Sequence, residues 1–373
     1  MRHSLSSLHL RYASHSVYWA TIFCFIKLFI FFFAYHSVQS QGLDAKICSW
    51  DCGYYESIAH GGYAKELRSG HSNLAFYPLY PWLVNTLFSW TSLSFAIQGV
   101  ILNFILFFFG IFLFLEWAKE LGFKNYYYVP ALILTLDRNT IWSHIPYTEA
   151  LFFFLSMVFV LILRRKVWGE GSVYLASFVG GLASGTRSVG VAFVAAIGFS
   201  RLRYFLRKPH LGILCALLGI LGLAGFFAYL HFTRGAWNLS LEAMSHWGRK
   251  FDPWSIFSSA FFLFKSFYVP TVFLFVAAFW GIVGKIKGLE FSADEKMSCF
   301  VMMFLAMASS IPVSLARYLS LVYLAYPVFA YFLLHYKGRV HQIFWIIFYV
   351  AEFVMQILMT QKFFRGEVFS WAA

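Results

Sequence analysis

The sequence predicts an all-α polytopic membrane protein, and two observations carry this prediction. Of the 373 residues, 60% are hydrophobic and only 12% are charged, whereas a soluble domain carries roughly 25% charged residues. The apolar residues form runs of about 20, the length of a helix that crosses a bilayer, and not the alternating ten-residue segments of a membrane β-barrel. A water-soluble globular fold is therefore excluded.

The first apolar run covers residues 17–38 and follows a polar stretch that contains Arg2 and Arg11. It is longer than the 7–15-residue core of a cleaved signal peptide. We expect an uncleaved signal-anchor with its amino end in the cytoplasm. Ten further spans are expected at 95–117, 126–145, 147–163, 172–186, 189–206, 210–232, 262–284, 297–315, 318–336 and 341–361.

Two pairs of these runs are separated so tightly that the expected number is 10 or 11 spans. No repeat and no soluble accessory domain is visible, so residues 1–373 form one transmembrane domain. Glycines 180, 181 and 185 are expected to allow close helix packing.

Basic residues explain the formal net charge of +13 without nucleic acid. They gather in short segments between apolar runs, as cytoplasmic loops facing anionic lipid do, and no basic-aromatic nucleic-acid module is present. Threading the chain through the bilayer places five basic segments in the cytoplasm, at 119–124, 164–166, 201–208, 285–296 and 337–339.

The polar segment at 39–94, between the first two spans, then lies outside the cytoplasm. It holds four of the sixteen acidic residues, Asp44, Asp51, Glu56 and Glu66. We expect interfacial helices there, with Asp51 near the headgroup level. An acid at a helix start also satisfies amide donors, which is the structural alternative for Asp51.

The same threading places the remaining distinctive polar groups on that face. Because ionisable groups at membrane depth are costly and usually functional, we expect them to form one site. They are Asp137 to Asn139, residues 146–149 with Glu149, residues 185–188 with Arg187, residues 246–250 with His246, Trp247, Arg249 and Lys250, and Arg317 with Tyr318.

The five cysteines give no disulfide framework. Cys24, Cys215 and Cys299 lie in apolar runs and fit packing roles. Cys48 and Cys52 lie close together outside the membrane, so a disulfide between them is possible, but it is not favoured if both lie on one helix, because four-residue spacing there is poor geometry for a bridge. No external His or Asp cluster has metal-ligand spacing, so no cofactor is expected and a divalent ion is not favoured.

Several motifs resemble those of the GPI mannosyltransferase II (PIG-V) family. Residues 50–63 read W-D-x-x-Y-x-x-x-I-A-x-x-G-Y and 76–81 read F-Y-P-L-Y-P, which resembles the family's first luminal loop. Residues 147–152 (Y-T-E-A-L-F), 183–188 (A-S-G-T-R-S), 317–318 (R-Y) and 326–329 (Y-P-V-F) are similar to its later motifs. The matches occur in order over about 280 residues.

This resemblance implies a C-type (GT-C) glycosyltransferase fold. It also implies transfer of a hexose, mannose in that family, from a polyprenyl- or dolichyl-phosphate donor to a lipid or glycolipid acceptor on the luminal or extracytoplasmic face. The eukaryotic family adds the second mannose of the GPI precursor, whereas bacterial relatives share the motifs without making GPI. Because the chain is short, we expect a bacterial plasma membrane before an endoplasmic reticulum membrane.

For such a transfer, the phosphate leaves as an anion, so one base, several cations and a dry cleft suffice. Asp51 is the candidate base and Glu56 the alternative. Arg187, Arg317, Arg249 and Lys250 are candidate phosphate ligands. For the two arginines at 187 and 317, structural pairing with Glu149 or Asp137 is the alternative, and for 249–250 it is a solvated loop.

The candidates for sugar or acceptor contact are Trp50, Tyr54, Asp137, Glu149, His246 and Trp247. Tyr54 also fits an interface anchor, and the two acids also fit a role in orienting the arginines. Two competing functions remain at this point. A lipid-linked sugar flippase would place polar residues at the midplane, where Lys27 and Glu352 lie, and a non-catalytic subunit would keep the fold without activity.

Overall fold

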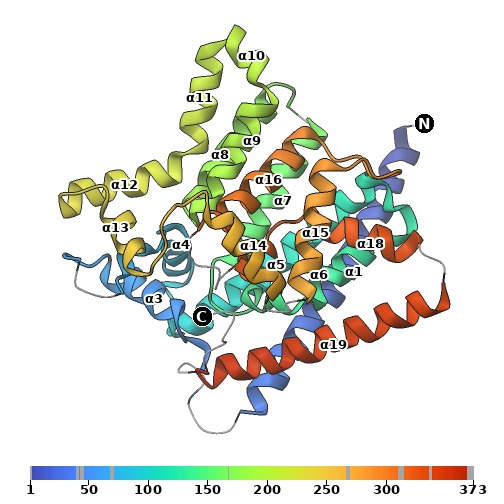
Figure 1. Cartoon of the computed structure of the whole chain (residues 1–373), viewed down its shortest axis with the longest axis horizontal. Helices are drawn as coiled ribbons and strands as arrows, with labels where there is room; N and C mark the ends of the chain where they lie inside the picture. Colours follow the sequence, from blue (N-terminus) through green and yellow to red (C-terminus); the bar gives the residue numbers. More distant parts are fainter. Residues whose placement is uncertain are drawn as a thin grey trace.

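The computed structural model describes residues 2–38, 42, 46–67, 71–166, 168–265, 269–309, 315–335 and 338–367 (Figure 1). Asp44 and Lys337 lie outside the described residues. The described chain is almost entirely helical and is built as a multi-pass membrane protein, as the sequence predicts. Within these residues, three helices are long and apolar enough to cross a bilayer, with bounds Ser14–His36, Phe95–Tyr126 and Arg339–Phe364, and the bent pair Pro209–Gly219 and Leu221–Arg234 makes a fourth if it is one span.

The centre of the bundle consists of α5 (Phe95–Ala118), α7 (Glu149–Arg165), α8 (Gly171–Ser184), α9 (Val191–Ser200) and α16 (Ala293–Met307). Their long apolar runs bury side chains on most faces, as expected for helices surrounded by other helices. The largest fully buried aromatic side chains include Trp117, Phe114, Phe152 and Phe159.

Outer helices pack on this centre. Helix α1 (Arg2–His36) contacts α5 and α19 (Arg339–Phe364), and α15 (Val269–Val283) contacts α18 (Ala325–His335). The remaining helices are α3 (Asp51–Gly61), α4 (Leu79–Phe88), α6 (Tyr128–Leu136), α10 (Leu202–Arg207), α11 (Pro209–Gly219), α12 (Leu221–Arg234), α13 (Leu239–His246), α14 (Ser255–Lys265), α17 (Leu315–Leu319) and the short turns η1 (Asn73–Ala75), η2 (Lys119–Phe123), η3 (Lys124–Tyr126), η4 (Arg138–Ser143) and η5 (Ser188–Gly190).

Several predicted spans are broken, and this corrects the sequence-based helix bounds. The run at 126–145 ends as α6 before Asp137, whose carboxylate accepts the Asn139 amide and starts the separate turn η4. The run at 210–232 bends by 63° between α11 and α12. The run at 189–206 breaks at Arg201, and the one at 318–336 breaks after α17. Apolar composition reports burial in lipid or protein but carries little information on such breaks.

The structure joins Cys48 and Cys52 in a disulfide with a Cα–Cα distance of 5.0 Å, a bridge that the spacing left possible but did not favour. The unfavourable geometry applied only if both residues lay on one helix. In fact α3 begins at Asp51, so Cys48 belongs to the preceding turn and its side chain reaches Cys52. The bridge fixes the chain on both sides of Trp50 and Asp51.

Close contact of glycines confirms the expected packing of the 180–185 segment. A Cβ atom at Gly181 would lie 2.1 Å from the Leu218 carbonyl oxygen, and one at Gly222 would lie 2.5 Å from the Gly185 amide nitrogen. Helices α8 and α12 therefore touch through their backbones. The Gly185 carbonyl also accepts the Leu79 amide at 3.1 Å, which ties α4 to the same point.

Ion pairs gather at the ends of the central helices opposite to Glu149. Arg164 and Arg165, at the end of α7, bind Glu120, and Arg164 also binds Glu295 at the start of α16. Arg201, at the end of α9, binds Asp294. Four of the segments threaded to one face from the sequence, 119–124, 164–166, 201–208 and 285–296, thus meet at one end of the bundle.

Candidate active site

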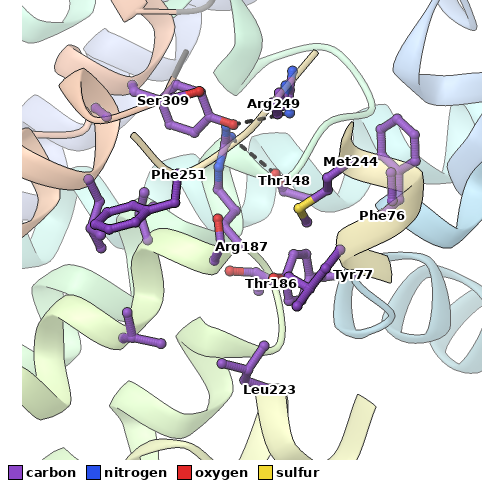
Figure 2. Close-up of a pocket in the computed structure, with 18 of the residues that line it drawn as sticks. Phe76, Tyr77, Thr148, Thr186, Arg187, Leu223, Met244, Arg249, Phe251 and Ser309 are labelled. Atoms are coloured by element: carbon purple, nitrogen blue, oxygen red, sulfur yellow. Dashed lines mark hydrogen bonds between the residues drawn. The ribbon is translucent and has the colours of Figure 1, made fainter. Parts of the chain in front are cut away.

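A cavity of about 580 Å³ lies where α3 and η1 meet the ends of α8, α13, α16 and α17 (Figure 2). Its walls are mostly apolar, with side chains such as Phe76, Tyr77, Leu223, Met244 and Phe251. Its polar lining comes from segments far apart in the sequence: Asp51, Thr148, Thr186, Arg187, Ser188, Arg249, Lys250, Ser309, Arg317 and Tyr318.

Asp51 enters this cavity from the first turn of α3. Its amide donates to the Tyr147 hydroxyl at 3.1 Å, and that hydroxyl donates to the Ser49 carbonyl at 3.0 Å. The preceding residue, Trp50, has a positive φ of 60°, an uncommon conformation for a residue with a side chain. The disulfide, the Tyr147 contact and this turn together orient the carboxylate.

Arg317 joins two carboxylates. Its Nη1 donates to Asp51 Oδ2 at 2.7 Å, and its Nε donates to Glu149 Oε1. Its guanidinium also lies over the rings of Tyr147 and Trp142, with centroids 4.7 and 4.9 Å away. Cation–π contacts of this kind stabilise a desolvated arginine, so Arg317 is held on several sides.

Arg187 continues the network on the other side of Glu149. Its Nη1 donates to Glu149 Oε1 and to Thr148 Oγ1, the latter at 3.2 Å. Its guanidinium lies 4.5 Å from the centroid of Tyr318, whose hydroxyl accepts from Arg249 Nη1 at 3.3 Å. Figure 2 shows the Arg187 side chain reaching toward Thr148, with Arg249 nearby on the same side.

The side chains that line the cavity carry mostly positive charge, whereas the carboxylate of Glu149 lies behind them. Glu149 is 3% exposed and does not line the cavity, and its Oε2 has no hydrogen-bond partner among the described residues. Among the described residues, four cations but only one carboxylate, that of Asp51, line the cavity. The cavity therefore suits an anionic ligand.

Tyrosines beside Asp51 stay neutral. Partial burial and the Asp51 carboxylate raise the pKa of Tyr54, and the same two causes raise the pKa of the buried Tyr55. Both phenols therefore remain protonated at neutral pH.

A cluster of aromatic side chains lies beside the cavity. Tyr54 stacks on Phe76 with centroids 4.8 Å apart, Trp247 meets the edge of Tyr54 at 5.4 Å, and His71 stacks on Trp247 at 3.7 Å. Of these, only Phe76 lines the cavity itself. The neighbouring candidates Trp50 and His246 are both exposed, and neither lines it.

Asp137 does not reach this cavity. Its carboxylate accepts from the Tyr326 hydroxyl at 3.0 Å and from the Asn139 amide at 2.9 Å, and its carbonyl accepts from Gln356 at 2.7 Å. These contacts cap η4 inside the bundle, so the local role of Asp137 is structural.

Lys27 and Glu352, the two polar exceptions inside predicted spans, are both paired. Lys27 donates to Thr140 Oγ1 at 2.7 Å, and Glu352 binds Arg138. The cavity beside Asp137 and Glu352 measures only about 20 Å³, too small for a sugar. This region therefore lends no support to a transport path through the described residues.

Sequence reasoning assigned no individual role to four side chains of the site, although three of them, Tyr147, Thr148 and Tyr318, lie within the segments expected to form it. Thr148 and Tyr318 contact Arg187, while Tyr147 and Trp142 contact Arg317. Thr148 directly precedes Glu149, Tyr318 directly follows Arg317, and Tyr147 lies two residues before Glu149, so their places in the motifs were an available signal. Trp142 carries none, because only the fold brings it to Arg317. In the described part of the chain, no group of three His, Cys, Asp or Glu side chains is placed to hold a metal.

Together, the helical bundle and the cavity at one of its ends define a polytopic membrane protein with a GT-C-type fold. The structure is similar to the crystal structure of ArnT from Cupriavidus metallidurans bound to undecaprenyl phosphate, with a TM-score of 0.53 and 14% sequence identity. The likeness covers 89% of this chain but 64% of ArnT, so the chain spans less than two thirds of that protein. No family model and no curated protein matches the sequence.

Proposed function

We propose that this protein is a membrane glycosyltransferase that takes a sugar from a polyprenyl-phosphate donor. The observation that carries the proposal is the cavity in which one carboxylate, Asp51, is combined with the cations of Arg187, Arg249, Lys250 and Arg317. The ArnT structure of similar fold holds undecaprenyl phosphate, a ligand with the anionic group and the lipid tail that this apolar, cationic cavity suits.

In the proposed reaction, Asp51 accepts the proton of an acceptor hydroxyl. The oxygen of that hydroxyl forms a bond to the anomeric carbon of the donor sugar. The bond from that carbon to the phosphate oxygen breaks, and the phosphate keeps the electron pair. Because the leaving group is already an anion, it needs cations and no protonating acid. Arg187, Arg249 and Lys250 supply this positive charge.

Glu149 and Arg317 have supporting roles in this proposal. Glu149 positions both arginines from behind the cavity wall. Arg317 fixes Asp51 by its 2.7 Å contact and adds positive charge near the phosphate. Trp142 and Tyr147 position Arg317 in turn.

The sugar and the acceptor are proposed from the motif resemblance. Mannose is the first hexose to test, and the acceptor is a lipid or glycolipid that contacts Tyr54 and Trp247 beside the cavity. The Cys48–Cys52 disulfide supports a non-cytosolic site, because such bonds persist in oxidising compartments. A bacterial plasma membrane is proposed ahead of the endoplasmic reticulum.

Reconstituted full-length protein with polyprenyl-phosphate mannose and a panel of lipid acceptors tests the proposal. We expect Asp51→Asn to lower turnover by at least about a hundredfold, the usual contribution of a positioned base. Glu56→Gln, a matched loss of a carboxylate on the same helix α3, should retain activity.

Equal turnover by wild type and Asp51→Asn would remove Asp51 as the base. Loss of turnover in Glu56→Gln alone would move the base to that residue. Absence of transfer from every polyprenyl-phosphate hexose tested would contradict the enzyme proposal and favour a transporter or a non-catalytic subunit.

A further inference from the structure

A second cavity, of about 340 Å³, lies at the opposite end of the central helices. It is formed where α7 ends, where α8 begins and where α9 is followed by α10 and α11. Its lining comprises Leu163, Lys166, Gly169, Glu170, Ser172, Val173, Tyr174, Arg201, Tyr204, Phe205 and Cys215. Because Glu149 begins α7 and Lys166 follows its last residue, roughly 25 Å of helix separates this cavity from the candidate active site.

Positive charge surrounds this second cavity. Lys166, Arg203, Arg207 and Lys208 are exposed, and none of them forms an ion pair with a carboxylate in the described part of the chain. Arg201 is already paired with Asp294. One acid, Glu170, is nearby, and its carboxylate accepts from the Tyr204 hydroxyl at 2.9 Å. The surface therefore has an excess of positive charge.

Exposed apolar side chains alternate with these cations. On α10, Leu202 and Leu206 share one side and are 52% and 74% exposed, while Arg203 and Arg207 share the adjacent side. Figure 1 places α10 at the tip of the arm formed with α11, far from α3 and α13. A short helix with apolar and basic sides is typical of the membrane interface.

We propose that this α10 corner binds the headgroup of an anionic glycerophospholipid. The lipid phosphate would lie at the mouth of the cavity beside Lys166, with Arg203, Arg207 and Lys208 neutralising the surrounding leaflet. Leu202 and Leu206 contact the acyl chains at the same depth. Charge complementarity selects this ligand, because anionic lipid attracts cations held at the membrane surface, and a multi-pass protein meets it directly.

The experiment uses purified full-length protein in detergent, titrated with short-chain phosphatidylglycerol and, separately, short-chain phosphatidylcholine. Native mass spectrometry counts the lipids that remain bound. Each cation contributes about fivefold to anionic-lipid affinity, so K166Q/R203Q/R207Q/K208Q should lose at least about tenfold in affinity for phosphatidylglycerol. The matched control K124Q/K285Q/K287Q/R339Q removes four other exposed cations and should bind within about twofold of wild type.

Equal losses in both quadruple variants would overturn the proposal, because binding would then follow total charge. Equal affinity of wild type for the two lipids would overturn it as well. Displacement of phosphatidylglycerol by sodium phosphate, but not by sodium chloride of the same ionic strength, would assign the corner to a free anion instead. The single variant K166Q, which removes one exposed side chain, should show a smaller loss in the same direction. Since the readout requires no sugar transfer, it stands apart from the proposed function.

Discussion

At the scale of single residues, Glu149 determines how the site is assembled. It is the common partner of Arg187 and Arg317, and Arg317 in turn holds Asp51. Buried charges of this kind depend on one another, because removing one partner leaves an uncompensated charge in a poorly solvated place. Glu149 therefore controls both the stability of the cavity wall and the position of the proposed base.

Replacement of Glu149 by Gln should lower stability by roughly 3 kcal/mol, because two buried guanidinium groups lose their shared countercharge. Thermal unfolding in detergent measures this effect, and sugar transfer should fall with it. Glu242→Gln on α13 is the control, because Glu242 is exposed and its loss should cost less than about 0.5 kcal/mol. Similar melting temperatures for the two variants would contradict the assigned role of Glu149.

At the scale of elements, the backbone contact between α8 and α12 positions the loop that carries Arg187. Gly222 packs directly against Gly181 and Gly185, and Arg187 follows two residues after Gly185. The start of α4 binds the same loop through the Leu79 amide. Any separation of the two helices therefore moves Arg187 relative to Glu149 and Thr148.

Gly222→Ala tests this coupling, because the new Cβ would lie 2.4 Å from the Gly181 carbonyl oxygen and 2.5 Å from the Gly185 amide nitrogen. Backbone atoms cannot yield without moving a helix, so we expect at least about a tenfold loss of sugar transfer. Gly225→Ala is the matched control on α12, since a Cβ there meets nothing within 4 Å. It should keep full activity, and parallel losses in both variants would contradict the argument.

At the scale of the whole molecule, the central helices carry two different ends. One end holds the cavity with Asp51, and the other holds the ion pairs of Arg164, Arg165 and Arg201 together with α10. Since α7 connects the two ends directly, we expect them to face opposite sides of the membrane. Short basic segments are retained in the cytoplasm, so the Asp51 end is expected outside it.

Single cysteine variants test this orientation with a membrane-impermeant maleimide. Lys250→Cys, at the cavity, should be labelled in intact cells, whereas Arg207→Cys, on α10, should be labelled only after permeabilisation. Labelling of the wild type gives the background from its own cysteines, of which Cys215 and Cys299 are buried. Labelling of both variants from the same side would contradict the two-ended arrangement, and a reversed pattern would contradict the external site.

Sequence alone predicted the fold class and most of the charged centre. Asp51, Glu149, Arg187 and Arg317 were recognisable because each combines an ionisable side chain with an apolar setting, where an unpaired charge is too costly to be incidental. Asp137 had the same appearance, yet its partners lie inside the bundle. Helix packing determines which partner a buried charged side chain contacts. No local sequence pattern contains that information.

Helix breaks and the disulfide were beyond the sequence for a related reason. The bend between α11 and α12 falls within an uninterrupted apolar run, so hydropathy gives no signal there. The Cys48–Cys52 bridge depends on α3 beginning at Asp51, and a shift of one turn in the helix start reverses the expectation. Boundaries are the weakest part of pattern reasoning, and both errors are errors of boundary.

Arg317, which contacts both Asp51 and Glu149, has a kinetic consequence under the proposed reaction. While the cavity is empty, Asp51 Oδ2 accepts from Arg317 Nη1 at 2.7 Å, so this oxygen is occupied and not open to an acceptor hydroxyl. An arriving phosphodiester competes for the same guanidinium and thereby loosens its hold on Asp51. The protein would then work in a fixed order, donor first and acceptor second.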